Sequence, residues 1–305
     1  MNTIPPTQVQ TQTIDLPHGI SLACRISGPV LGPRLIFLHG FPQGAFVWDA
    51  LLVHFGAQGY RCIAPNLRGY AGSSAPDSPE AYRAKALCQD IVALLNATGK
   101  APVAALIAHD WGGALAWNVA ATHGALMQRF IAINSPHPAA FLKALQHNPV
   151  QQQASAYMHY LSRSDAEQGL RDNGYARLWP FLRDGDHGAA DPDWLTPALR
   201  EAHATVWDQG LRGPCAYYQQ SPLKPPTLQD RSVMDVVLPD AITHVKVPTE
   251  VIWGERDRAL QPCLLDGLDA YIQDLRIHRV SDASHWIVHE QPQTVMALIA
   301  AALAR

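Results

Sequence analysis

Long hydrophobic runs, paired cysteines and an excess of charge of one sign are all absent from this sequence of 305 residues. No apolar run is long enough to span a bilayer. The opening residues, MNTIPPTQVQTQTI, lack the basic region, apolar stretch and small-residue cleavage site of a secretory signal. We therefore expect a soluble cytoplasmic protein with no membrane partner.

Charge indicates no macromolecular partner. The formal net charge is −3, and acidic and basic residues are mixed along the chain. Such a distribution offers no extended positive surface for nucleic acid or anionic lipid. We expect no nucleic-acid partner, and the sequence leaves the oligomeric state open.

Cysteine and histidine show no ordered spacing. The five cysteines are odd in number and widely scattered, without CxxC pairs, and we predict that all are buried reduced thiols. They are Cys24, Cys62, Cys88, Cys215 and Cys263. Fourteen histidines are present, but no HExxH or comparable ligand spacing occurs, so we predict no metal site.

The first half of the chain alternates short β-rich runs with helix-length amphipathic segments, which is typical of a mostly parallel sheet covered by helices. We therefore predict an α/β fold. Residues 7–16 and 21–27 form an antiparallel hairpin at the sheet edge in this interpretation. The other predicted elements of this half are strands over 34–40, 61–65, 103–110 and 129–134, and helices over 80–99 and 112–123.

A different pattern occupies about residues 136 to 245. No strand-like apolar run occurs there, and Gln-rich and aromatic helical stretches are broken by Pro and Gly. The alternating pattern then resumes with strands over 248–257 and 275–282 and helices near 262–272 and over 292–305. We predict a core domain formed by residues 1–135 and 246–305, with a helical cap domain, residues 136–245, inserted in it.

Asp110 lies at the predicted junction between a buried strand and a helix, in ALIAHDWGGALAW. A turn tight enough to lift its central side chain above a sheet strains that residue and tolerates only small neighbours. Ala108 and Gly112 satisfy this need, and the pattern is GxSxG with Asp in place of Ser. The motif predicts Asp110 as a carboxylate nucleophile, and a helix N-cap is the alternative for this motif alone.

A carboxylate nucleophile needs a base that activates water and an acid that orients the base. Asp257 and His285 each follow a predicted strand, so both lie at the carboxyl ends of strands, where such a fold gathers its chemistry. We predict that Asp110, Asp257 and His285 converge above the sheet.

The HGFP motif at residues 39–42 follows a buried strand, at the place where this architecture builds an oxyanion hole from backbone amides. We assign that role to the amides of Phe41 and Trp111, and we expect both residues to contact substrate. A simple turn is the alternative reading of this short motif.

Together, the motifs HGFPQ, LRGYAGSS, HDWGGALAW, WGERD and ASHW resemble the epoxide hydrolases of the α/β-hydrolase fold over almost the whole chain. In that family an Asp attacks an epoxide carbon to give an alkyl ester, and a His paired with an Asp activates the water that hydrolyses it. The resemblance places these roles on Asp110, His285 and Asp257. It implies an α/β-hydrolase fold, and the chemistry needs no cofactor.

The resemblance also implies two cap tyrosines that donate hydrogen bonds to the epoxide oxygen as it becomes an alkoxide. The stretch ASAYMHYLSRSD is similar to the first tyrosine-bearing helix and indicates Tyr157, with Tyr160 as its rival. The segment GPCAYYQQ is similar to the second and favours Tyr218 over Tyr217. The expected substrate is an apolar or aromatic epoxide that enters between cap and core and leaves as a vicinal diol.

Haloalkane dehalogenases share the fold, the Asp nucleophile and the following Trp, whose indole N–H holds the departing halide. Trp111 fits that reading equally well, but Phe41 stands where such enzymes often supply an Asn as second donor. A cap tryptophan would have to replace it, from the set Trp179, Trp194 and Trp207. Dehalogenation is therefore the second hypothesis.

Three further hypotheses are weaker. Haloacetate dehalogenases place arginines after the nucleophile, whereas this chain continues Trp-Gly-Gly-Ala, and a serine esterase needs Ser where Asp110 stands. A non-catalytic ligand-binding protein of this fold is a hypothesis of a different class. The complete set of nucleophile, base, acid and oxyanion turn argues against it.

Overall fold

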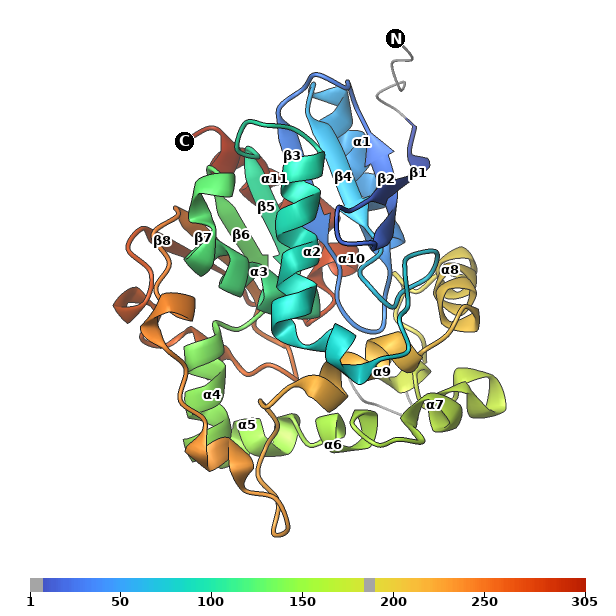
Figure 1. Cartoon of the computed structure of the whole chain (residues 1–305), viewed down its shortest axis with the longest axis vertical. Helices are drawn as coiled ribbons and strands as arrows, with labels where there is room; N and C mark the ends of the chain where they lie inside the picture. Colours follow the sequence, from blue (N-terminus) through green and yellow to red (C-terminus); the bar gives the residue numbers. More distant parts are fainter. Residues whose placement is uncertain (1–7, 184–189) are drawn as a thin grey trace.

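The computed structural model describes residues 8–183 and 190–305, where eight strands form one sheet (Figure 1). The strand order is β1-β2-β4-β3-β5-β6-β7-β8. β3 to β8 run parallel, and β2 is antiparallel to both β1 and β4. The bounds are β1 Gln10–Asp15, β2 Ser21–Ser27, β3 Arg34–Leu38, β4 Arg61–Pro65, β5 Ala105–His109, β6 Phe130–Ile133, β7 Thr249–Gly254 and β8 Leu275–Val280.

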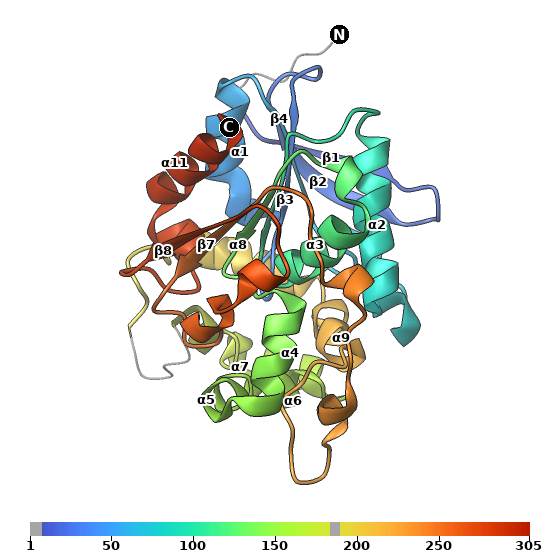
Figure 2. The same ribbon diagram turned by 90° about the vertical axis from the view of Figure 1, so that its left-hand side faces the viewer.

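The central strands are apolar on both faces because helices cover both sides of the sheet. β3, RLIFL, and β5, ALIAH, are buried at every position. α1 (Asp49–Ala57) and α11 (Pro292–Leu303) pack on one face, and α2 (Ala84–Ala97) and α3 (Asp110–Thr122) pack on the other (Figure 2). This is the predicted mostly parallel sheet flanked by helices, with the predicted antiparallel hairpin at its edge.

The segment between β6 and β7, residues 134–248, is here called the β6–β7 connection. Its described part contains helices and no strand, as the sequence predicted. These helices lie together beyond the carboxyl ends of the parallel strands (Figure 1). They are α4 Pro138–His147, α5 Pro149–Ala154, α6 Tyr157–Leu161, α7 Ala166–Tyr175, α8 Pro197–Asp208 and α9 Arg212–Gln220.

The prediction of a helix near residues 262–272 was wrong. Two 3-10 turns, Pro262–Leu265 and Leu268–Ala270, stand there instead. Asp266 is extended, with ψ 130°, and Gly267 takes a φ of +72°, so no continuous helix can pass through this pair. The turns place Cys263 at the surface, which corrects the prediction that all five cysteines are buried.

Outside the β6–β7 connection, two α-helices of the described chain were not predicted, namely α1 and the short helix α10, Ile287–Glu290. Residues 1–7, which belong to the opening stretch interpreted above, lie outside the described residues. Within the described ranges, no helix is both long enough and apolar enough to cross a membrane.

Candidate active site

Asp110 lies where β5 ends and α3 begins. Its φ of +51° falls in the left-handed region that residues other than glycine rarely adopt, so the turn is strained. The hydroxyl of Ser135 donates to the backbone carbonyl of Asp110 at 2.8 Å and holds this turn. The side chain of Asp110 is 13% exposed and opens into a cavity at the carboxyl edge of the sheet.

Two glycines leave the space that the turn needs. A Cβ atom added to Gly40 would lie 2.2 Å from Oδ1 of Asp110. A Cβ atom added to Gly112 would lie 2.6 Å from the carbonyl oxygen of His39. Any larger residue at either position would displace the Asp110 carboxylate or the loop that carries Phe41.

Backbone amides hold one side of the Asp110 carboxylate. The amide of Phe41 donates to Oδ1 at 2.7 Å, and the amide of Trp111 is a second donor to the carboxylate. Burial raises the pKa of Asp110, while the charge of His285 and these two amides act in the opposite direction. The Phe41 amide binds Oδ1, and Oδ2 lies toward His285.

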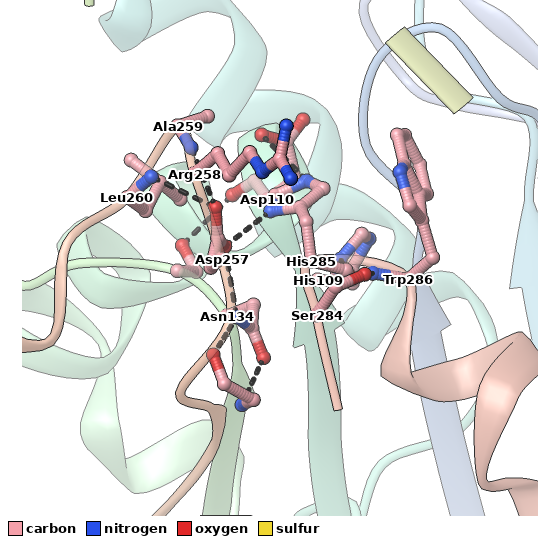
Figure 3. A network of polar contacts seen from close by, with 12 residues as sticks. His109, Asp110, Asn134, Asp257, Arg258, Ala259, Leu260, Ser284, His285 and Trp286 are labelled. Carbon is pink, nitrogen blue, oxygen red and sulfur yellow. Dashed lines mark hydrogen bonds and ion pairs between the residues drawn. The ribbon is translucent and has the colours of Figure 1, made fainter. Parts of the chain in front are cut away.

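His285 lies between Asp257 and Asp110, in the loop after β8 (Figure 3). Its Nδ1 is 2.6 Å from Oδ2 of Asp257, and its Nε2 is 3.7 Å from Oδ2 of Asp110. Because Nδ1 is bound to the carboxylate of Asp257, Nε2 is the ring nitrogen that can take a proton near Asp110. The structure therefore brings together the three residues that the sequence singled out, from the ends of three different strands.

Asp257 is fully buried and accepts four hydrogen bonds. Its Oδ1 accepts from the amides of Ala259 at 2.9 Å and Leu260 at 2.8 Å. Its Oδ2 accepts from Nδ1 of His285 and from the side-chain amide of Asn134, at 2.8 Å (Figure 3). These donors compensate the carboxylate for lost water and fix its orientation toward the imidazole.

Tyr157 begins α6, and Tyr218 lies in α9, with their ring centroids 6.1 Å apart. Burial raises the pKa of both phenols above their usual value, and the nearby charge of Asp110 adds to the effect. Both hydroxyls therefore stay protonated and can donate throughout the ordinary pH range. Tyr217 differs, because its hydroxyl already donates to the backbone carbonyl of Arg68 at 2.9 Å.

Two cavities share Asp110, Tyr157 and Tyr218 as lining residues. One, of about 410 Å³, is here called the polar lobe, and its other walls include Gln153, Tyr160, Arg177, Arg258 and Trp286. The other, of about 400 Å³, is called the apolar lobe, and its walls include Leu115, Phe141, Met158, Leu223 and Leu260. The carboxylate and the two phenols thus stand where the two lobes meet.

The alpha/beta hydrolase fold family matches residues 33–292 of the sequence. The chain belongs to the α/β-hydrolase family. Over 286 residues this hydrolase is 32% identical to AB hydrolase superfamily protein YfhM of Bacillus subtilis, covering 92% of this chain and 94% of that protein. Over 285 residues it is 31% identical to epoxide hydrolase 3 of Xenopus tropicalis, covering 92% of this chain and 74% of that protein.

Solved structures resemble the whole hydrolase. An epoxide hydrolase of Bacillus megaterium, crystallised with an inhibitor, matches with a TM-score of 0.85 and 27% identity, covering 96% of this chain and all of that one. A structure described among novel epoxide hydrolases from metagenomes of hot environments matches with a TM-score of 0.84 and 35% identity, covering 96% of this chain and 97% of that one. The relatives of this α/β-hydrolase therefore include epoxide hydrolases, as the motifs implied.

Three tryptophans of the β6–β7 connection direct their side chains to other contacts in this hydrolase. The indole N–H of Trp207 donates to the carbonyl of Pro42 at 2.6 Å, and that of Trp179 donates to the carbonyl of Gly174 at 2.9 Å. Trp194 stacks on the ring of His289, with centroids 4.8 Å apart. None of the three is among the described residues that line either lobe.

The contacts of Gln43 were not predicted from the sequence. Its side-chain nitrogen lies 3.0 Å from Nε2 of His203 in α8 and 2.8 Å from Nε2 of His289 in α10. Burial lowers the pKa of His203 to about 4 and that of His289 to about 3, so both rings are neutral and can accept from Gln43 at neutral pH. The loop that carries Phe41 is thereby tied to the β6–β7 connection.

Asn134 was also missed. It is fully buried, its φ is +37°, and its Oδ1 accepts from the amide of Gly254 at 2.8 Å while its nitrogen donates to Asp257. The available signal was a polar residue at the end of a buried strand, on the edge where Asp110 and Asp257 were expected. Without the neighbouring strands in place, nothing distinguishes it from an ordinary turn residue.

Proposed function

We propose that this α/β-hydrolase converts an epoxide to a vicinal diol through a covalent ester on Asp110. The observation that carries the proposal is the meeting of Asp110 with Tyr157 and Tyr218 at the junction of two lobes. A nucleophile on one side and two protonated phenols on the other suit a strained ether, which must be attacked at carbon while its oxygen gains a proton. The epoxide hydrolases among the relatives support the same reaction.

In the first step, Oδ2 of Asp110 forms a bond to one ring carbon, and the bond between that carbon and the epoxide oxygen breaks. The oxygen leaves as an alkoxide and takes a proton from Tyr157 or Tyr218, which becomes a phenolate. An alkoxide is a poor leaving group at neutral pH, so donors aimed at the developing charge lower the barrier. The product of this step is a hydroxyalkyl ester of Asp110.

In the second step, Nε2 of His285 takes a proton from water, and the hydroxide adds to the ester carbonyl of Asp110. The carbonyl oxygen becomes an oxyanion and accepts hydrogen bonds from the amides of Phe41 and Trp111, the donors that already bind the carboxylate. Collapse expels the diol, which takes the proton from His285. Asp110 is left as a neutral carboxylic acid, and its proton passes to the tyrosine phenolate. The overall reaction is therefore epoxide plus water to diol.

The β6–β7 connection serves as the cap in this proposal. It supplies Tyr157 and Tyr218, while the rest of the chain supplies Asp110, Asp257 and His285. We propose residues 1–135 and 246–305 as the core domain and residues 136–245 as the cap domain. Substrate then binds between them, with its apolar part in the apolar lobe.

Dehalogenation is the second candidate, because Trp111 lies beside the nucleophile and lines the apolar lobe. A departing halide needs donors on both sides, and the structure offers few. Phe41 has no donor side chain, and the indole groups of Trp179 and Trp207 already donate to backbone carbonyls. Epoxide hydrolysis is the reaction that uses the phenols.

The two reactions are separated by a parallel assay of styrene oxide and a brominated alkane, with diol and bromide release as readouts. We expect diol from the epoxide and no bromide. Bromide without diol would contradict the proposal and make Trp111 a halide ligand. If neither product appears and Asp110 is never modified, a non-catalytic binding protein is the better description.

We predict that Asn134→Gly lowers kcat about 10- to 100-fold, because Asp257 loses a donor whose hydrogen bond to a charged group contributes about 1.5–3 kcal/mol. Glycine tolerates the φ of +37°, so the variant removes the amide without adding backbone strain. The less satisfied carboxylate holds the proton of His285 more strongly, which moves the acid limb of the pH–rate profile to higher pH. A folded variant with unchanged kcat and an unchanged profile would contradict this positioning role.

A further inference from the structure

Most arginine side chains in the described part of the chain bind a carboxylate or a backbone carbonyl oxygen. Arg177, Arg231, Arg258 and Arg276 form neither kind of contact with any described residue, and all four are exposed. Arg231 and Arg276 line neither lobe of the candidate site. Arg177 and Arg258 both line the polar lobe, so the two residues lie in the wall of a cavity that Asp110 also lines.

The two arginines reach this lobe from different parts of the fold. Arg177 lies between α7 and the 3-10 turn Trp179–Arg183, and its guanidinium lies over the ring of Tyr160, 5.3 Å from the centroid. Arg258 directly follows Asp257, and in Figure 3 its side chain extends in the direction of Asp110 and His285. One cation therefore comes from the β6–β7 connection and one from the loop after β7.

No carboxylate of the described lining neutralises these cations. Among the described lining residues, the carboxylates of the polar lobe are those of Asp110 and Asp257. Asp257 is fully buried and its four hydrogen bonds come from other residues, while Asp110 is bound by the amides of Phe41 and Trp111. The apolar lobe has a different character, because its charged lining residues are Asp110 and Arg83, and Arg83 is paired with Glu80 at 3.9 Å.

We propose that Arg177 and Arg258 form a binding subsite for the carboxylate group of the substrate, an inference that rests on the function proposed above. The substrate is then an epoxide with a substituent on each ring carbon, because the nucleophile and both phenols lie between two lobes. One substituent is apolar and lies in the apolar lobe. The other ends in a carboxylate, which the planar guanidinium forks bind and which links the β6–β7 connection to the core.

The test compares a 2,3-disubstituted epoxide that carries a carboxylate with its methyl ester, which keeps the shape and removes the charge. The readout is the ratio of kcat/KM for acid over ester. We expect the wild-type protein to prefer the acid, and Arg177→Gln and Arg258→Gln each to lower the ratio about three- to tenfold, since both groups are partly solvated. Added salt should lower the wild-type ratio as well.

Arg231→Gln and Arg276→Gln are the matched controls, because these arginines are also exposed and line neither lobe. Both should retain the wild-type ratio. If the wild-type protein treats acid and ester alike, or if all four variants have the same ratio, the carboxylate subsite is wrong while the proposed function stands. If neither compound nor styrene oxide yields diol, the proposed function itself is wrong.

Discussion

Asp110→Asn should fold normally and form diol from an epoxide at least about 10,000-fold more slowly than the wild-type protein, as expected for loss of a covalent nucleophile. An amide oxygen is too weak a nucleophile to open the ring. Asparagine keeps the shape of the side chain and tolerates the φ of +51° at this position, so the fold should persist. Diol formation followed over time, with a thermal unfolding curve for each protein, measures the two effects separately.

Asp90→Asn is not a useful control for this loss, because Asp90 is itself ion-paired with Arg68 in the core. Asp269→Asn is better suited, since that carboxylate is exposed on the 3-10 turn Leu268–Ala270 and lines neither lobe. It should retain wild-type activity. Full activity in a folded Asp110→Asn protein would show that another group attacks the epoxide.

Tyr157→Phe combined with Tyr218→Phe should slow ester formation about 100- to 10,000-fold, the range typical of a positioned general acid. Each single variant should have a smaller effect, since the remaining phenol can still donate. Hydrolysis of an ester already formed should change little, because that step uses His285 and the backbone amides. Rapid-quench measurement of the two steps distinguishes them.

Tyr217→Phe is the matched control for the two phenols. Tyr217 precedes Tyr218 in α9 and lines the apolar lobe, but its hydroxyl already donates to the carbonyl of Arg68. Its loss should lower the free energy of unfolding by about 1 kcal/mol and leave ester formation unchanged. Equal rate losses in Tyr217→Phe and Tyr218→Phe would indicate that packing, and not proton donation, is responsible.

The sheet was predictable because its strands are short apolar runs bounded by turn residues. RCIAP matches β4 residue for residue, and RLIFL and ALIAH have no polar face to confuse with a surface helix. The segment PCLLDGLDAY was mistaken for a helix because its apolar spacing outweighed the Asp-Gly pair. In the structure the backbone conformation of that pair interrupts the helix.

The candidate triad was predictable because all parallel strands end at one edge. Residues at three strand ends must then lie near one another, whatever their distance in the sequence. The supporting contacts of Asn134 and Gln43 could not be predicted in this way. They depend on side-chain reach between elements far apart in the chain, such as the contacts of Gln43 with His203 and His289.

The extent of the β6–β7 connection could be predicted from the sequence, but the packing of its side chains could not. A long segment without strands was visible, yet its tryptophans could equally have lined a cavity or filled a core. The structure shows Trp207 fully buried, with its indole bound to Pro42. The division of the cavity into two lobes of different polarity is set by packing among residues from α2, α3, α4, α6 and α9, which no local pattern encodes.

The central claim is that Asp110 carries the substrate as an ester that His285 helps to hydrolyse, and the mass of the His285→Gln protein after reaction with an epoxide tests it most directly. We expect a stable increase equal to the mass of the epoxide, located by peptide mapping on Asp110, and none that persists in the wild-type protein. An unmodified His285→Gln protein that still forms diol, or an adduct on another residue, would contradict the account.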